Sequence, residues 1–169
     1  AAYDAAVSNE LESRFADTDV PSRIHVASGS GTGLRYGENP HQPAAFYPAA
    51  SDPAGLAAAV QHAGKELSFN NYLDLDGALR LVRSLYVTCA GEPHGCIIVK
   101  HSNPCGAAVD STQVGAWENA LASDTESAFG CVIAFTKPVE RGTAEAIGDH
   151  FLECIIAPGY EPGAIEVLS

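Results

Sequence analysis

The sequence predicts an α/β fold in which helices cover both faces of a sheet. Short apolar runs typical of buried strands occur at residues 96–99, 131–135 and 154–157. Segments with apolar residues at helical spacing lie before and between these runs. Because short strands alternate with helices along the chain, we expect βαβ units and a layered α/β/α sheet. The 169 residues, 46% of them hydrophobic, are enough for one domain with a buried core.

The first 33 residues are expected to precede this domain. Residues 17–33 are rich in Asp, Pro, Ser, Gly and Thr, a composition typical of a flexible linker. The sequence lacks an initiator Met and contains no Met at all, so we expect a piece of a longer chain, whose domain begins near Leu34. Apolar residues that recur every four positions predict a short amphipathic helix before the linker: Tyr3, Val7, Leu11 and Phe15.

The first half of the domain contains one predicted helix. Residues 34–42 are polar and turn-rich, with an Arg-Tyr pair and two side-chain amides. A short strand is expected at 59–62, before a turn at Gly64. A helix is predicted over 72–86 from apolar residues at helical spacing, namely Leu75, Ala78, Leu79, Val82 and Leu85.

The second half alternates strands with helices. The strand at 96–99 is followed by a Pro/Gly break, and the next helix has Ser111 or Thr112 available as its N-cap. Three apolar residues predict that helix: Val114, Trp117 and Leu121. The remaining elements are expected in the order strand, helix, strand and incomplete helix, at 131–135, 143–151, 154–157 and 163–169.

The charge of the chain excludes two classes of partner. The formal net charge is -12, with only 9 Lys and Arg residues. Nucleic-acid phosphates and anionic membranes both attract clustered positive charge, so we expect neither as a partner. A basic residue in a pocket of so acidic a protein is therefore conspicuous.

The cysteines and the chain start indicate a cytoplasmic protein. The N-terminus has neither the basic nor the apolar segment of a leader, and no apolar run approaches ~18 residues, so no membrane segment is expected. Free thiols in a reducing compartment explain an odd number of cysteines without CxxC spacing better than disulfides do. The five cysteines are Cys89, Cys96, Cys105, Cys131 and Cys154.

Lys100 and His101 directly follow the strand at 96–99. An arbitrary Lys-His pair most often reaches solvent or satisfies a loop carbonyl. In α/β folds, however, strand ends deliver ligand-facing side chains, and the chain beyond the last ladder bond can turn so that both reach one pocket. Histidine can take and return a proton near pH 7, while a cationic neighbour stabilises a developing negative oxygen. The pair therefore indicates transfer chemistry at a carbonyl.

Arg35 and Tyr36 form a second candidate site. A guanidinium group matches a phosphate or carboxylate, and an adjacent phenol can stack or donate a hydrogen bond, so the pair favours an anion site over a solvated charge. Gly130, just before the strand at 131–135, allows close approach of a ligand to the backbone or a tight turn with positive φ. The residue alone does not decide between these alternatives.

A zinc site is not expected. Residues 101–108 partly match the His-x-Glu and Pro-Cys-x-x-Cys signature of zinc deaminases. Asn103 stands where glutamate is required, and Ala108 stands where the second cysteine is required. The sequence also contains no GxxxxGK[ST] or GxGxxG motif, so phosphate-binding loops of those kinds are not predicted.

Five blocks of sequence carry a family resemblance. They are LRYGENPHQ at 34–42, GKELSFNNYLD at 64–74, VKHSNPCG at 99–106, SAFG at 127–130 and IAPGYE at 156–161. In this order they resemble the bifunctional purine-biosynthesis enzymes that join AICAR formyltransferase to IMP cyclohydrolase, AICAR being phosphoribosylaminoimidazolecarboxamide. The blocks span most of the chain, which makes a chance match very improbable.

The resemblance implies a domain organisation. It implies a cytidine-deaminase-like α/β/α fold that is duplicated in the complete formyltransferase, with only the first of the two subdomains in this chain. Residues 1–16 then correspond to the closing helix of an upstream cyclohydrolase domain, 17–33 to a linker, and 34–169 to the first formyltransferase subdomain, truncated at its C-terminus. The family's homodimers, with formyltransferase sites at the subunit interface, are implied for the complete protein.

The resemblance also implies a reaction and its residues. The reaction is formyl transfer from 10-formyltetrahydrofolate, a co-substrate, to the 5-amino group of AICAR, giving FAICAR, which the parent chain closes to IMP. His101 matches the proton-shuttling histidine, and Lys100 matches a lysine that stabilises the transition state. The residues expected to bind the AICAR nucleotide are Arg35, Tyr36, Gly130 and Asn70.

Two other hypotheses stay open at this point. The isolated chain can be an inactive fragment or a nucleotide-binding module, because the resemblance places the family's catalytic asparagine and most folate contacts beyond Ser169. A non-catalytic scaffold is the third hypothesis, and it requires exposed apolar surface where the second half of the composite site would pack.

Overall fold

The computed structural model describes residues 2–15, 28–48, 55–91 and 93–169. Two compact units contain them: Ala1–Gly33 with Ala45–Ala59, and Leu34–Ala44 with Val60–Ser169. Most of the predicted linker at 17–33 lies outside the described residues. Assignment of these ranges to domains of a longer protein stays a prediction.

The first unit contains few elements. Helix α1 spans Ala2–Phe15, as the four-residue spacing predicts, with apolar side chains that are largely exposed, Tyr3 at 79% and Phe15 at 78%. Strands β1 (Thr32–Gly33) and β2 (Ala45–Phe46) pair antiparallel. A short 3-10 helix, η1, spans Leu56–Ala58. The prediction of a strand at 59–62 is wrong, because those residues follow η1 without pairing in a β-ladder.

The second unit is built on a four-stranded sheet of order β4-β3-β5-β6. Its strands are β3 (His94–Lys100), β4 (Asn103–Asp110), β5 (Cys131–Phe135) and β6 (Leu152–Ile156). Strand β3 is antiparallel to both neighbours, and only β5 and β6 run parallel. The expected sheet of βαβ units is therefore correct for β5 and β6 alone.

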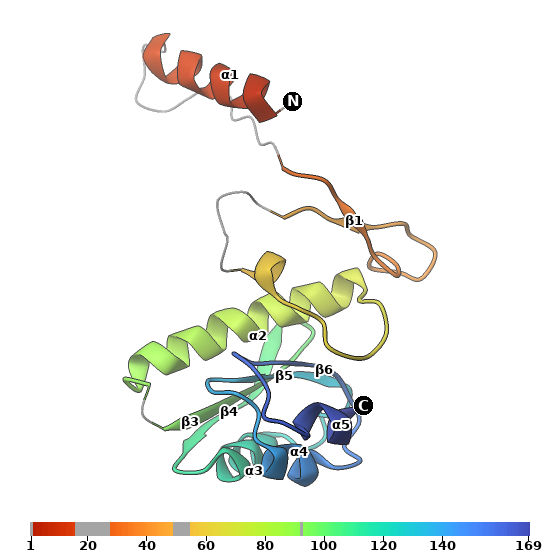
Figure 1. Cartoon of the computed structure of the whole chain (residues 1–169), viewed down its shortest axis with the longest axis vertical. Helices are drawn as coiled ribbons and strands as arrows, with labels where there is room; N and C mark the ends of the chain where they lie inside the picture. Colours follow the sequence, from red (N-terminus) through yellow and green to blue (C-terminus); the bar gives the residue numbers. More distant parts are fainter. Residues whose placement is uncertain (1, 16–27, 49–54, 92) are drawn as a thin grey trace. The chain divides into compact units, whose positions relative to one another are not determined.

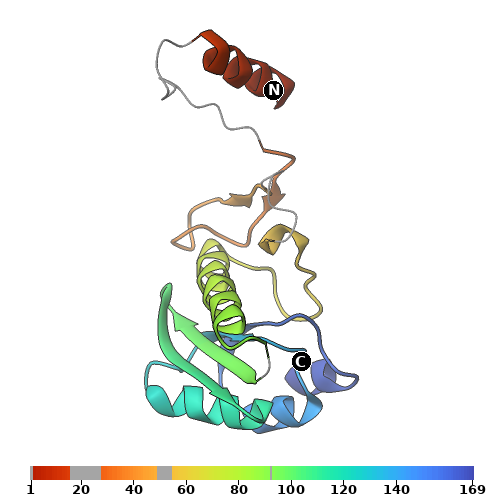
Figure 2. The ribbon, with the colours of Figure 1, turned by 90° about the vertical axis from the view of Figure 1, so that its left-hand side faces the viewer.

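Helices cover both faces of this sheet, as predicted. Helix α2 (Phe69–Thr88) packs on one face, and α3 (Gln113–Ser123), α4 (Arg141–Ile147) and α5 (Ala164–Leu168) lie on the other (Figure 1). The view turned by 90° shows the same layers (Figure 2). The second unit thus has an α/β fold in which a mixed β-sheet lies between two helical layers.

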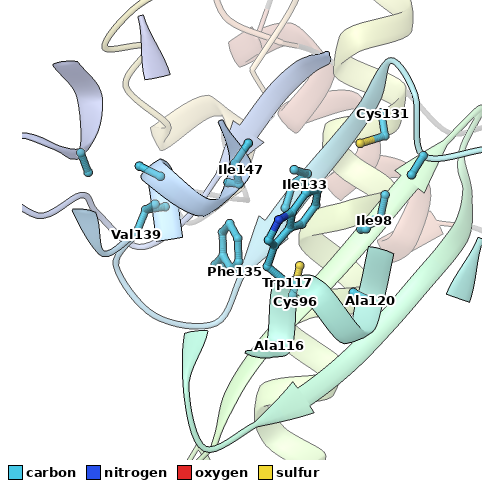
Figure 3. Close-up of a cluster of buried hydrophobic side chains, with 13 residues drawn as sticks. Cys96, Ile98, Ala116, Trp117, Ala120, Cys131, Ile133, Phe135, Val139 and Ile147 are labelled. Carbon is cyan, nitrogen blue, oxygen red and sulfur yellow. The ribbon is translucent and has the colours of Figure 1, made fainter. Parts of the chain in front are cut away.

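Strand alternation divides the core between the two faces. On the α3 side, Cys96 and Ile98 of β3 meet Trp117 of α3 in a cluster that is closed to solvent (Figure 3). On the other side, Gly77 of α2 lies against Val99, the β3 residue that follows Ile98. Both faces of β3 are therefore buried, which explains its unbroken apolar run.

Capping residues determine where the helices begin and end. Ser68 caps α2, because its side chain accepts the Asn71 N–H while the Asn71 side chain accepts the Ser68 N–H, so α2 begins earlier than the predicted residue 72. Thr112, one of two predicted caps, begins α3. The helix predicted over 143–151 ends at Ile147, because Gly148 has a positive φ of 54°.

Candidate functional site

The turn after β3 carries His101. Lys100 is the last residue of β3 and pairs with Asn103 of β4, so His101 and Ser102 alone connect the strands. Both have positive φ, 52° and 62°, as in a type I′ hairpin. For residues other than glycine this conformation costs roughly 1–2 kcal/mol each. The chain thus turns directly after Lys100, as the sequence allowed beyond the last ladder bond.

Two side chains hold this turn. The Asp74 carboxylate, on α2, accepts a hydrogen bond from the Ser102 N–H at 2.6 Å. Asn103 Nδ2 donates to the His101 carbonyl oxygen at 2.9 Å. The side chain of His101 is exposed, so its imidazole is accessible at the end of the sheet.

Lys100 connects β3 to the segment before β5. Its Nζ donates to the Phe129 carbonyl at 2.7 Å, next to Gly130. Hydrogen bonds from Ser127 hold the pKa of Asp124 below its usual value, and the Lys100 charge lowers that pKa further. Lys100 and residues 124–130 therefore lie together.

Gly130 has the positive φ that the sequence left as one alternative, at 70°. Its N–H donates to the Phe151 carbonyl at 2.8 Å and is therefore already used within the protein. The Phe129 and Phe151 rings lie 5.1 Å apart beside it, and both are more than half exposed.

Arg35 and Tyr36 lie against each other. The Arg35 guanidinium is 4.8 Å from the centroid of the Tyr36 ring and donates to its hydroxyl at 3.2 Å. The backbone of both residues is bound to the chain entering α2, since Arg35 N–H donates to Leu67 and the Tyr36 carbonyl accepts from Phe69. An exposed guanidinium stacked on a ring is fixed in direction and suits an anion.

Asn70 fastens the 34–42 segment to the N-terminus of α2. Its Nδ2 donates to the Glu38 carbonyl at 3.0 Å, so part of its hydrogen-bonding capacity is used within the protein. A substrate contact through the remaining amide oxygen stays a prediction.

Three charged groups affect the pKa of the Cys154 thiol. Burial raises its pKa to about 11, with further increases from Glu153 and Asp74 and a decrease from Arg35. All three charges are therefore near Cys154 on β6. Because Asp74 also binds the turn at Ser102, the Arg35 region and the His101 turn approach the same part of α2.

Irregular strand pairing occurs at this end of the sheet. The β3–β4 register shifts after Ile98, and the β5–β6 register shifts after Cys131, which leaves Glu153 as an extra residue in β6. The Glu153 carboxylate accepts a hydrogen bond from Asn71 of α2. Bulges of this kind redirect side chains and are common beside active sites.

The structure thus brings Lys100, His101 and Gly130 to one end of the sheet, and Arg35, Tyr36 and Asn70 to the start of α2. Within the described ranges, no hydrogen bond or ion pair joins the two groups directly. Two carboxylates beside these groups were missed by the sequence prediction: Asp74, which binds the His101 turn, and Glu153, which binds Asn71 of α2. Asp74 could have been found from helical spacing, since it follows Asn70 by four residues; Glu153 depends on a bulge that no sequence pattern signals.

The described parts of the chain contain no candidate metal site and no candidate membrane span. No group of three or more His, Cys, Asp or Glu side chains there could hold a metal ion. None of the helices there combines the length and the apolar character that crossing a membrane requires.

Known proteins match over the whole chain. Residues 1–169 match the family model described as "AICARFT/IMPCHase bienzyme". Relatives named "Bifunctional purine biosynthesis protein PurH" include those of Dinoroseobacter shibae, 47% identical over 100% of this chain, and Rippkaea orientalis, 43% identical over 99%. The Myxococcus xanthus relative is 44% identical over 100% of this chain.

The match covers only part of each relative. The chain spans 32% of the Rippkaea and Myxococcus proteins and 31% of the Dinoroseobacter protein. With a family model that matches every residue, the chain belongs to the AICARFT/IMPCHase family of purine biosynthesis.

Proposed function

We propose that this chain contributes part of the formyltransferase site in a protein of full family length. The reaction is transfer of the formyl group from 10-formyltetrahydrofolate to the 5-amino group of AICAR, which gives FAICAR. The observation that carries the proposal is the grouping of Lys100, His101 and Gly130 at one sheet end, in a chain that matches the family throughout.

His101 is the proposed proton acceptor. The amine nitrogen of AICAR attacks the formyl carbon and forms a C–N bond, while the carbonyl electron pair moves to oxygen. The amine is a poor nucleophile because its lone pair is delocalised, so removal of its proton by the His101 imidazole assists the step. Collapse of the tetrahedral intermediate breaks the bond to the folate nitrogen, which takes a proton and leaves as tetrahydrofolate.

Lys100 is the proposed electrostatic partner. Its ammonium uses one donor on the Phe129 carbonyl, and a lysine has three donors. The remaining donors can face the developing oxyanion or the departing folate nitrogen. The Phe129 contact keeps Lys100 beside the turn while leaving its charge available.

Arg35 and Tyr36 are proposed to hold the nucleotide's anionic group, with Asn70 as a further contact. The carbonyl of Gly130 is the proposed backbone contact to AICAR. The remaining implications of the family belong to the same proposal: a cytidine-deaminase-like subdomain that is duplicated, a homodimer, closure of FAICAR to IMP by the parent chain, and a cytoplasmic location.

For the isolated 169 residues, nucleotide binding without turnover is the second candidate function. The coverage of 31–32% of the relatives favours it, because most of the family's length is outside this chain.

One pair of assays tests both candidates. A protein of full family length should convert AICAR and 10-formyltetrahydrofolate to FAICAR and tetrahydrofolate over many turnovers, whereas the isolated chain should bind AICAR in calorimetry without turnover. Arg35→Ala should weaken that binding by about tenfold, the scale of a charge-assisted hydrogen bond, and Arg80→Ala, on an exposed part of α2, should not. Multiple turnovers by the isolated chain would contradict the second candidate, and no transfer by the full-length protein would contradict the first.

A further inference from the structure

The turn that carries His101 depends on contacts for its conformation. His101 and Ser102 both have positive φ, yet neither is glycine, asparagine or aspartate, the residues that a type I′ hairpin favours. In the part of the chain that the structure describes, one hydrogen bond reaches these two residues from outside the hairpin. It runs from the Ser102 N–H to the Asp74 carboxylate, at 2.6 Å.

The helix that presents Asp74 is well fixed. Asp74 lies in the second turn of α2, whose start is held by the capping box of Ser68 and Asn71. Gly77, three residues further on, faces the same turn, since a Cβ added there would lie 3.8 Å from the Ser102 carbonyl oxygen. One face of α2 therefore lies against the hairpin turn at both Asp74 and Gly77, which are one helical turn apart.

We propose that Asp74 is a positioning residue for His101. By accepting the Ser102 N–H, its carboxylate holds the turn in the left-handed conformation and gives the His101 imidazole one direction. The inference rests on the proposed role of His101 in formyl transfer, and Asp74 itself does not touch the substrate. Displacement of a catalytic group by about 1 Å can lower a rate by about 10²-fold, so loss of this hydrogen bond is expected to be visible in kcat.

The test uses a protein of full family length with AICAR and 10-formyltetrahydrofolate. Asp74→Ala removes the acceptor and should lower kcat by about tenfold or more, with KM for AICAR within about twofold. Asp74→Asn keeps an acceptor oxygen and should recover most of kcat. The matched control is Asp76→Ala, which removes a carboxylate that pairs with Arg80 at 2.8 Å and should leave kcat unchanged.

A rescue variant separates positioning from a general effect on folding. Glycine adopts positive φ readily, so Ser102→Gly should restore kcat to Asp74→Ala by stabilising the turn without the carboxylate. The Ser102 amide of the wild-type 169-residue chain should also exchange slowly with deuterium in NMR measurements, and this readout does not depend on activity. If Asp74→Ala does not fold, amide exchange and the Asp74→Asn variant decide the matter.

Three results would overturn the proposal: kcat of Asp74→Ala within about threefold of wild type, no rescue by Ser102→Gly, or unprotected exchange at Ser102. A different result would contradict the proposed function: full turnover by His101→Ala. If His101→Ala is slow while Asp74→Ala is fast, the positioning role alone is wrong.

Discussion

At the scale of single residues, left-handed backbone occurs on both sides of the candidate site. Gly130 has φ 70°, and His101 and Ser102 have φ 52° and 62°. The first could be anticipated, because glycine before a strand often takes positive φ. The other two could not, because their conformation depends on a hydrogen bond to Asp74, 28 residues away in the sequence. Local sequence carries no signal for such a contact.

Two carboxylates give the chain a predictable response to acid. Asp110 accepts the Thr112 N–H at 3.0 Å, the main cause that lowers its pKa, and hydrogen bonds from Ser127 lower the pKa of Asp124. A folded pKa below the unfolded value of about 3.9 means that the stabilisation is complete above about pH 4 and is lost as pH falls through the folded pKa.

Melting temperatures of the chain between pH 2 and pH 7 test this. Wild type should lose stability steeply below about pH 4, whereas Asp110→Asn and Asp124→Asn should lose less, because an amide does not titrate there. The same acid slope in all three proteins would show that these hydrogen bonds do not affect the pH dependence.

At the scale of elements, the sequence predicted β3, β5 and β6 but missed β4. Strand β4 begins Asn103-Pro104 and contains Gly106, residues that usually mark a break. A proline is tolerated here because β4 is an edge strand. Since a hairpin follows β3, the chain returns antiparallel, and the sheet becomes mixed instead of being built from βαβ units throughout.

Gly106 is the position at which β4 approaches α3 most tightly among the contacts described for its glycine. A Cβ at this position would collide with the Ala120 carbonyl oxygen of α3 and would lie 3.3 Å from Ile98 Cδ1. Ala120 and Ile98 both belong to the core cluster (Figure 3). The first contact is with backbone, so a change of rotamer cannot relieve it. The close approach of β4 to α3 therefore requires glycine.

Gly106→Ala should lower the free energy of unfolding by about 3 kcal/mol, the upper part of the range for overpacking. Gly142→Ala is the matched control, because nothing lies within 4 Å of a Cβ there, and alanine in α4 should be neutral or stabilising by up to about 1 kcal/mol. Urea titration of both variants measures the difference. Equal stability of the two would mean that α3 and β4 are not packed this closely.

At the scale of the whole molecule, the candidate site depends on segments that are far apart in sequence. The sequence blocks identified Arg35, Asn70, Lys100 and Gly130 separately. Their convergence on α2 and one sheet end follows from tertiary contacts, such as Asn70 to Glu38 and Lys100 to Phe129, which no periodicity encodes. The chain spans 31–32% of its relatives, so the complete site is proposed for a protein of full family length.

The role of His101 in formyl transfer is the central claim, and kcat of His101→Ala tests it most directly. In a protein of full family length, this variant should lose about 10²-fold or more in kcat, with a modest change in AICAR binding, because a general base is removed and the nucleotide contacts are kept. His62→Ala, at an exposed position beside Tyr160, is the matched control and should keep its kcat. A kcat of His101→Ala within about threefold of wild type would contradict the account.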